Sequence, residues 1–328
     1  MRRANIFIGL AVSISSALMA TSAAAAQSSD DSRPPMASEA CGSASADPEV
    51  SPSVEIGEGT RSLRAHIPSA HDGATPLPLM IWLHGQGMSA SDMDDVTDLS
   101  AFGEQHGIVV AAPEGHEPDS GWMWEPGMAE FEPGLENRDV AFIDALIDQL
   151  GSELCLDLAR VYATGYSIGG HGASVLACRL SDRIAAVAAA PMFSDLAESC
   201  LASRAVPMIA FHQTGDEYVL FEGGLGGFLG DTLPWGTTKG EEPFFQRPDW
   251  SVSTVDRAES IALRNGCQVG ATSTPIAEGV VRLSWVCPEG ADVDLVVAEG
   301  GGHDWMIEGG PDTNELMWAF LSRFALPG

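Results

Sequence analysis

From residue 77 to its end, the chain alternates short apolar runs with segments of helical periodicity, and this alternation restricts the fold more than any other feature. Continuous apolar runs closed by glycine or proline predict buried strands at residues 77–85, 108–115, 159–167, 184–191, 205–216 and 292–303. Apolar residues at three- and four-residue intervals predict helices at residues 93–107, 138–154, 168–181, 256–267 and 313–324. The pattern predicts an α/β fold: a mostly parallel sheet with helices on both faces.

The N-terminal region predicts export. Residues 1–26 have a basic start, an apolar core and a small-residue end with Ala24 and Ala26, which is typical of a cleaved signal peptide. A membrane anchor is the alternative, but the apolar run is shorter than the ~20 residues of a spanning helix. Residues 27–53 are rich in Ser, Ala, Pro and Asp and predict a flexible linker, and residues 54–328 predict one folded domain. We expect a secreted protein, extracellular or periplasmic.

The charge balance restricts the partners. The chain has 46 Asp and Glu against 16 Lys and Arg, a net charge of −30. Such a surface repels nucleic acid and anionic membranes, so neither is an expected partner. Adaptation to a salty habitat is one hypothesis for this acidity, and solubility through charge is the plainer interpretation. We expect the protein to act as a monomer.

The chain contains six cysteines, an even number that in an exported protein favours disulfides over a metal site. Cys267 and Cys287 are the nearest candidates for a local pair. The remaining four could pair as Cys178–Cys200 and Cys41–Cys155, but the sequence leaves this connectivity open. No C-x-x-C motif occurs, so no metal or other cofactor is predicted.

The stretch "GYSIG" places Ser167 between a predicted strand and a predicted helix. This is the context of the G-x-S-x-G nucleophile elbow, in which a sharp turn exposes the serine hydroxyl. The alternative is a tight glycine turn without chemistry. As a nucleophile, Ser167 needs a base, and the base needs an orienting acid.

The chain order Ser, acid, His restricts the partners of Ser167. His303 follows the last predicted strand in a glycine-rich loop and is the predicted base, whereas His212 lies within an apolar strand and is interpreted as a core histidine. Asp216 stands just past a strand end and is the predicted acid. Glu217 is the runner-up and Asp195 a weaker candidate.

Further site residues follow from the same fold logic. The oxyanion hole is expected from the backbone N–H groups of Ile168 and of Gln86 or Gly87, in the loop after the first strand of the alternation. His84 is interpreted as a structural residue of that loop. Tryptophans near the site are candidate substrate contacts, with core packing as the alternative: Trp122, Trp124 and Trp305. Residues 218–250 interrupt the alternation and are either a flap over the site or a surface loop.

Several segments in this order, including "LHGQG", "RVYATGYSIGG", "HQTGD" and "GGGHDW", resemble the secreted polyhydroxybutyrate depolymerase-like and feruloyl esterase family of the α/β-hydrolases. The resemblance covers residues 54–326. It implies an α/β-hydrolase catalytic domain over residues 54–328, with Ser167, Asp216 and His303 as the catalytic triad.

The implied activity is that of a secreted serine carboxylic-ester hydrolase forming an acyl-enzyme. The expected substrates are feruloyl or acetyl esters of plant polysaccharide, or small aryl or alkyl esters. A polyester depolymerase is the first alternative, and a non-catalytic surface- or glycan-binding protein is the second. A peptidase is less favoured, because such peptidases carry an extra domain for which this length leaves no room.

Overall fold

A computed structural model describes residues 34–45, 50, 53–56, 59–115, 124, 138–196, 200–226, 251–307 and 309–327. Its elements are β1 (Ser53–Ile56), β2 (Gly59–His66), β3 (Leu77–Leu83), α1 (Ala90–Thr97), α2 (Leu99–His106), β4 (Val109–Pro113), α3 (Arg138–Glu153), β5 (Leu156–Tyr166), α4 (Ile168–Arg179), β6 (Ala186–Ala190), β7 (Met208–Gln213), α6 (Thr254–Arg264), β8 (Thr272–Ala277), β9 (Val280–Ser284), β10 (Val293–Ala298) and α7 (Thr313–Leu321).

A ten-stranded sheet runs in the order β1-β2-β4-β3-β5-β6-β7-β10-β9-β8. The strands from β4 to β10 are parallel, whereas β1 and β2 at one edge and β9 and β8 at the other are antiparallel to their neighbours. The expected mostly parallel sheet is confirmed. The four antiparallel edge strands were not predicted, because they are partly exposed and lack a continuous apolar run, and no helix separates them.

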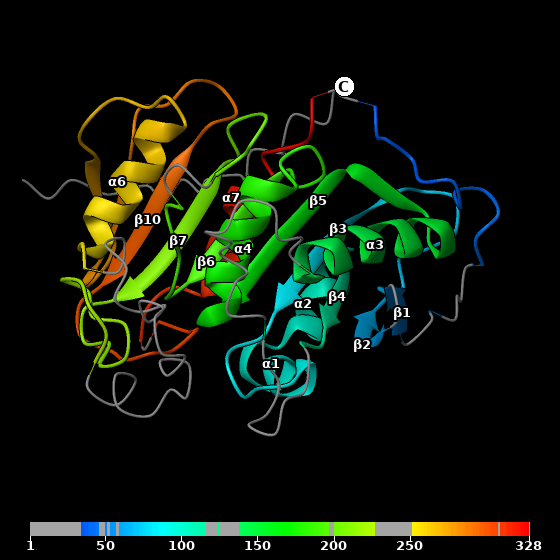
Figure 1. Cartoon of the computed structure of the whole chain (residues 1–328), viewed down its shortest axis with the longest axis horizontal. Coiled ribbons are helices and arrows are strands. Elements are labelled where there is room, and N and C mark those ends of the chain that lie inside the picture. The colour runs from blue at the N-terminus through cyan, green and yellow to red at the C-terminus, as the bar shows by residue number, and fades with distance from the viewer. Residues whose placement is uncertain are drawn as a thin grey trace, which may run out of the picture.

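Two apolar layers cover the sheet, because successive residues of a strand face opposite sides. Leu79, Ile81 and Leu83 of β3 face a core shared with α3, α4 and α6, whereas Met80 and Trp82 face a core shared with α1, α2 and α7. Figure 1 shows α4 and α6 in front of the sheet and α7 behind it. Both faces are therefore buried, as a parallel sheet requires.

The prediction of a single helix over residues 93–107 is wrong, because this segment contains a break between two helices. Asp98 has φ 52°, in the left-handed region, so the segment forms two helices, α1 and α2. The Asp98 N–H closes α1 by donating to the carbonyl of Asp94. As a result Leu99 and Phe102 are buried as expected, but Val96 is exposed.

Part of the segment expected as a flexible linker is fastened to the domain. The N–H of Ser38 donates to the carbonyl of Leu156, and that of Leu158 donates to the carbonyl of Met36, so residues 36–38 lie beside the start of β5. The disulfide Cys41–Cys155 closes this attachment. Composition alone does not show these contacts, because they are made mainly by the backbone and one cysteine. The expected signal peptide lies outside the described residues.

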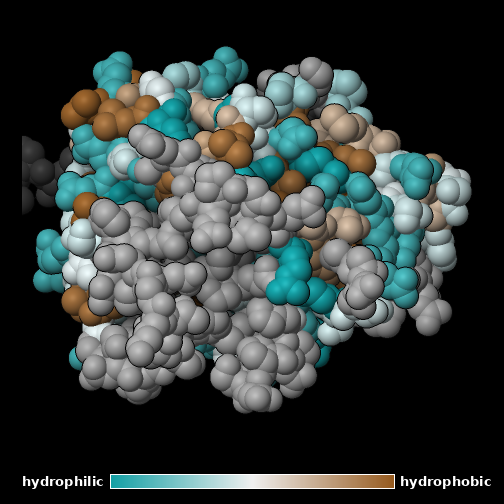
Figure 2. Space-filling model, viewed as in Figure 1, coloured by the Kyte–Doolittle hydropathy of each residue, from teal (hydrophilic) through white to brown (hydrophobic). Residues whose placement is uncertain are grey.

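Two further disulfides join Cys178 to Cys200 and Cys267 to Cys287. All three pairings are among those that the sequence left open. In the described part of the chain, no helix is long and apolar enough to cross a membrane. On the face shown in Figure 2, the coloured hydrophobic residues form small separate patches among hydrophilic ones, in keeping with the net charge of −30.

Candidate active site

Ser167 lies at the sharp turn between β5 and α4, as the G-x-S-x-G pattern predicted. Its backbone has φ 55° and ψ −123°, a conformation that side-chain-bearing residues rarely adopt. Its N–H donates to the carbonyl of Ala190 at 2.6 Å, so the end of β6 holds the turn. The backbone strain is that of a nucleophile elbow, and Ser167 is only partly buried.

The glycines around Ser167 are required by close backbone contacts. A Cβ on Gly165 would lie 2.3 Å from the carbonyl carbon and oxygen of Gly169, and one on Gly170 would lie 2.4 Å from the carbonyl oxygen of Met192. A Cβ on Gly169 would lie 2.2 Å from the carbonyl oxygen of Leu83. These distances are shorter than any real Cβ contact. Only glycine therefore lets α4 begin this close to β3, β5 and β6.

Ser167, His303 and Asp216 form one hydrogen-bonded chain. Ser167 Oγ lies 2.8 Å from His303 Nε2, and His303 Nδ1 lies 2.8 Å from Asp216 Oδ2. With the ring proton on Nδ1, His303 donates to the carboxylate and accepts from the serine hydroxyl. The Asp216 side chain is fully buried, whereas that of His303 is 12% exposed. The arrangement can move a proton from the hydroxyl to the imidazole.

Asp216 is held as an anion. Burial by itself would raise the pKa of its carboxyl, but the hydrogen bond and charge of His303 and the N–H groups of Val219 and Tyr218 outweigh it, so the pKa is lowered. Those N–H groups donate to Oδ1 at 2.9 and 2.8 Å, leaving Oδ2 for the imidazole. A buried carboxylate with this set of donors fixes the direction of the His303 ring.

The loop that carries His303 is fastened to the end of β7. The side-chain amide of Gln213 is 3.3 to 3.4 Å from the carbonyl oxygens of Gly302, Asp304 and Met306. The Gly300 N–H donates to the hydroxyl of Thr214 at 2.9 Å. The acid and the base therefore sit on two loops that are bonded to each other along the neighbouring strands β7 and β10.

Two other histidines near the site are buried and neutral at pH 7. Burial lowers the pKa of His212 to about 4, and its Nδ1 bonds the carbonyl of Gln213 at 3.1 Å. Burial also lowers the pKa of His84 to about 4, and His84 Nε2 accepts from the N–H of Gly115 at 2.9 Å. Both lie in the structural settings that the sequence analysis assigned to them. His212 Nε2 is 3.9 Å from Asp216 Oδ2, so it also faces the acid.

The other acid candidates lie elsewhere. Glu217 is exposed. Asp195 forms an ion pair with Arg264 at 2.6 Å and accepts a hydrogen bond from Ser260 at 2.5 Å. Of the three acids weighed from the sequence, Asp216 is the one that the fold brings to His303.

Of the expected oxyanion residues, Ile168 directly follows Ser167, and Gln86 and Gly87 lie in the loop after β3. Ile168 is the first residue of α4, where helix N–H groups have no acceptor within the helix. Gln86 and Gly87 are exposed, in a turn closed by the Met88 N–H donating to the carbonyl of Gly85 at 3.2 Å. A Cβ on Gly169 would also lie 2.6 Å from the carbonyl oxygen of His84, so this loop adjoins the start of α4.

Two of the three tryptophans expected to contact substrate are buried in the core. Trp124 and Trp305 are each 1% exposed. The Trp124 indole N–H donates to the carbonyl of His84, and that of Trp305 donates to Asn314 Oδ1, both at 2.8 Å. Core packing, the alternative interpretation, therefore holds for both. Trp122 lies outside the described residues.

Residues that the sequence analysis did not select surround Ser167 and His303. The rings of Tyr166 and Tyr218 have centroids 5.4 and 5.2 Å from that of His303. Ile168 packs in a small apolar cluster that contains Met192, Val219 and Leu225. The available signals were weak: Tyr166 precedes the nucleophile, and Tyr218 follows the acid by two residues.

The segment expected as a flap begins as a tight turn. Val219 and Leu225 form an antiparallel bridge, and the Gly226 N–H donates to the carbonyl of Tyr218 at 2.9 Å. This turn presents Val219 and Leu225 to Ile168. Residues 227–250 lie outside the described part of the chain, so the flap interpretation stays a prediction.

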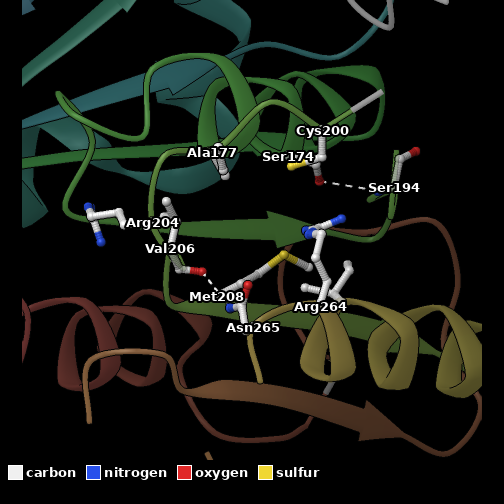
Figure 3. Close-up of a pocket in the computed structure, with 11 residues that line it drawn as sticks. Ser174, Ala177, Ser194, Cys200, Arg204, Val206, Met208, Arg264 and Asn265 are labelled. Atoms are coloured by element: carbon white, nitrogen blue, oxygen red, sulfur yellow. Dashed lines mark hydrogen bonds between the residues drawn. The ribbon is translucent and has the colours of Figure 1, made fainter. Parts of the chain in front are cut away.

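A separate hollow lies between α4 and α6. Ser174, Ser194, Met208 and Asn265 are among the residues that line it (Figure 3). Its volume of about 10 Å³ is that of one water molecule, too small for an ester. In the described part of the chain, no group of three or more His, Cys, Asp or Glu residues is placed to hold a metal ion.

Comparisons with known proteins agree with the fold. The chain is 28% identical over 273 residues to feruloyl esterase B of Piromyces equi, an alignment covering 81% of this chain and 46% of that protein. It is 29% identical over 266 residues to a candidate esterase, NocK, of Nocardia uniformis subsp. tsuyamanensis, covering 77% of this chain and 72% of that protein. The chain thus spans less than half the length of the first relative. No protein-family model matches it.

Among solved structures, an acetyl xylan esterase from Aspergillus awamori superposes with a TM-score of 0.54 at 13% sequence identity, covering 80% of this chain and 94% of that one. The α/β-hydrolase fold expected from the sequence is therefore confirmed. The resemblance to feruloyl esterases is confirmed by the sequence match. The chain is similar to proteins named as esterases in both sequence and fold.

Proposed function

We propose that this protein is a serine carboxylic-ester hydrolase in which Ser167 is the nucleophile, His303 the general base and Asp216 the orienting acid. The observation that carries the proposal is the continuous chain of two 2.8 Å hydrogen bonds from Ser167 through His303 to Asp216. The similarity to feruloyl and acetyl xylan esterases supports an ester as the substrate.

The reaction begins when Ser167 Oγ attacks the ester carbonyl and its proton passes to His303 Nε2. The buried anion of Asp216 stabilises the imidazolium that results. The tetrahedral oxyanion accepts hydrogen bonds from the N–H of Ile168 and from the loop at Gln86 and Gly87. His303 then gives its proton to the departing alcohol, which leaves an acyl group on Ser167.

Water completes the cycle. His303, neutral again, takes a proton from a water molecule as that water attacks the acyl-enzyme. As the second tetrahedral intermediate collapses, His303 returns the proton to Ser167 Oγ and the carboxylic acid is released. The proposed steps use only groups of this chain and water.

The surroundings of Ser167 suit an ester with an apolar or aromatic part. The apolar cluster at Ile168 and Val219 lies next to the nucleophile, and the ring of Tyr218, a residue that is 39% exposed, lies beside that of His303. We propose feruloyl or acetyl esters of plant polysaccharide, or small aryl and alkyl esters, as the substrate class. In this proposal Tyr218, rather than a tryptophan, is the aromatic residue that contacts the substrate.

We also propose that the protein is secreted. Three disulfides tie the described part of the chain, and such bonds persist in oxidising compartments. An extracellular or periplasmic enzyme would meet polysaccharide esters directly.

The test compares the wild type with Ser167→Ala on p-nitrophenyl acetate, methyl ferulate and a 3-hydroxybutyrate dimer ester. We expect turnover of the first two by the wild type and a loss of at least about 10³-fold in kcat for the variant. Circular dichroism checks that the variant is folded. Equal activity of variant and wild type would overturn the triad, and turnover of the hydroxybutyrate ester alone would move the substrate to polyesters.

A further inference from the structure

Tyr166 is the residue before the proposed nucleophile, and its ring lies between two loops of the site. On one side, a Cβ on Gly85 would lie 2.8 Å from Tyr166 Cδ1, so the ring presses against the loop expected to form the oxyanion hole. On the other side, its centroid is 5.4 Å from that of His303. One side chain therefore contacts both loops from the strand that ends in Ser167.

The hydroxyl of Tyr166 donates a hydrogen bond to the backbone carbonyl of His303. Burial, and then the nearby charges of Asp304 and Asp216, raise the pKa of Tyr166. The phenol therefore stays protonated, and remains a donor, throughout the pH range in which an esterase acts.

This bond completes the hydrogen bonding of the loop that carries His303, residues 300–306, which we call the base loop. Gln213 holds the carbonyls of Gly302, Asp304 and Met306, and the carbonyl of His303 itself goes to Tyr166. The loop enters through Gly300 and Gly301, which both have positive φ values of 76° and 64°. Such glycines give a chain conformational freedom. The backbone bond from the Gly215 N–H to the Gly300 carbonyl holds the start of the loop, and the side-chain hydrogen bonds hold the part that carries His303.

We propose that Tyr166 is a positioning residue that holds His303 at hydrogen-bonding distance from Ser167. The inference rests on the proposed function, in which His303 is the base. Because Tyr166 and Ser167 are adjacent on one rigid strand end, the Tyr166 hydroxyl fixes the base loop relative to the nucleophile itself. A small displacement of the imidazole is sufficient to slow attack by a large factor.

The chain offers a matched control on the same strand. Tyr162 also lies on β5, and its hydroxyl also donates to a backbone carbonyl, that of Phe324 at 2.9 Å. Tyr162 is fully buried in the core on the α7 face. Removing its hydroxyl deletes the same kind of bond without touching the base loop.

The experiment measures kcat, KM, the melting temperature and the rate of inactivation by a fluorophosphonate for wild type, Tyr166→Phe and Tyr162→Phe. The fluorophosphonate reads the reactivity of Ser167 without requiring the natural ester. For Tyr166→Phe we expect kcat and the inactivation rate to fall about tenfold, with KM changed by less than about twofold. For Tyr162→Phe we expect both rates to stay at the wild-type values, although its melting temperature falls at least as far.

Wild-type rates in Tyr166→Phe, or equal losses in the two variants, would overturn the positioning role. The proposed function is read separately, from labelling of wild-type Ser167. If the wild type reacts at Ser167 but cleaves none of the esters, the substrate class fails and the inactivation rates still decide the role of Tyr166. If Ser167 does not react at all, the proposed function fails and the inference fails with it.

Discussion

The loop that carries Ser167 and the loop that carries His303 are held by different kinds of contact. Around Ser167 the contacts are between backbones, at positions where a Cβ would lie 2.2 to 2.4 Å from a neighbouring backbone atom. Around His303 the contacts include hydrogen bonds to side chains: Tyr166 and Gln213 donate to carbonyls of the loop, and the Thr214 hydroxyl accepts from the Gly300 N–H. The first loop is fixed by close contact between backbones, whereas the second combines such a contact, between Gly215 and Gly301, with hydrogen bonds to side chains.

The difference explains why the two loops differ in how plainly the sequence reveals them. Backbone contact requires glycine at fixed spacings around Ser167, which gives the short pattern G-x-S-x-G. The side chains that bond the base loop lie 86 to 137 positions away in the chain from their partners, and any residue with a suitable donor or acceptor could replace them. These distant partners leave no local pattern, so near His303 the sequence shows only the stretch "GGGHDW".

On the His303 side of the comparison, the largest effect is expected from a substitution of the acid, Asp216. Replacing Asp216 by Asn removes the charge that stabilises the imidazolium and favours the wrong ring tautomer, so kcat should fall on the order of 10³- to 10⁴-fold with the fold intact. The measurement is steady-state hydrolysis of p-nitrophenyl acetate.

Glu217→Gln is its control, because the adjacent carboxylate is exposed and was the runner-up from the sequence. It should keep wild-type kcat. If Glu217→Gln loses as much activity as Asp216→Asn, the assignment of the acid is wrong.

The sequence predicted Ser167, Asp216 and His303, and these three residues lie in one hydrogen-bonded chain. Pattern and chain order were sufficient because the fold fixes which strand ends meet at the site. The tryptophans were different: Trp305 packs on Trp82 at a centroid distance of 4.8 Å, and nothing in the sequence distinguishes a buried indole from a pocket wall. The edge strands β1, β2, β8 and β9 were missed for a similar reason, since part-exposed strands lack a continuous apolar run.

A substitution of Gly169 tests the close backbone contacts around Ser167. An alanine there would place its Cβ 2.2 Å from the carbonyl oxygen of Leu83, so β3 and α4 must separate. We expect the free energy of unfolding to fall by about 3 kcal/mol or more. Urea denaturation measures the change.

Gly151→Ala in α3 is the matched control, since its Cβ would meet Leu158 Cδ2 and Ser38 Cβ at an ordinary 3.6 Å. It should be neutral or stabilising by up to about 1 kcal/mol. Similar losses in both variants would mean that any extra methyl group is harmful, and that close backbone contact is not what holds the elbow.

Substitutions that weaken the support of the base loop should cause smaller losses of stability and kcat, because the contacts of this loop are several and individually weak. Gln213→Ala leaves the carbonyls of Gly302, Asp304 and Met306 without their side-chain donor, which should cost about 1–3 kcal/mol of stability and slow kcat about tenfold. Gln149→Ala is the control, since its amide donates to a single carbonyl, that of Ser53 at 3.1 Å, away from the site.

Gln149→Ala should lose stability without losing kcat. If Gln213→Ala keeps wild-type kcat although its stability falls, the Tyr166 bond is sufficient to hold His303, and the support of the base loop is concentrated in one hydroxyl. If kcat falls as expected, the support is shared, because two side chains from different strands each hold part of the same loop. The first outcome would make the base loop resemble the elbow, which depends on a few contacts that cannot be spared.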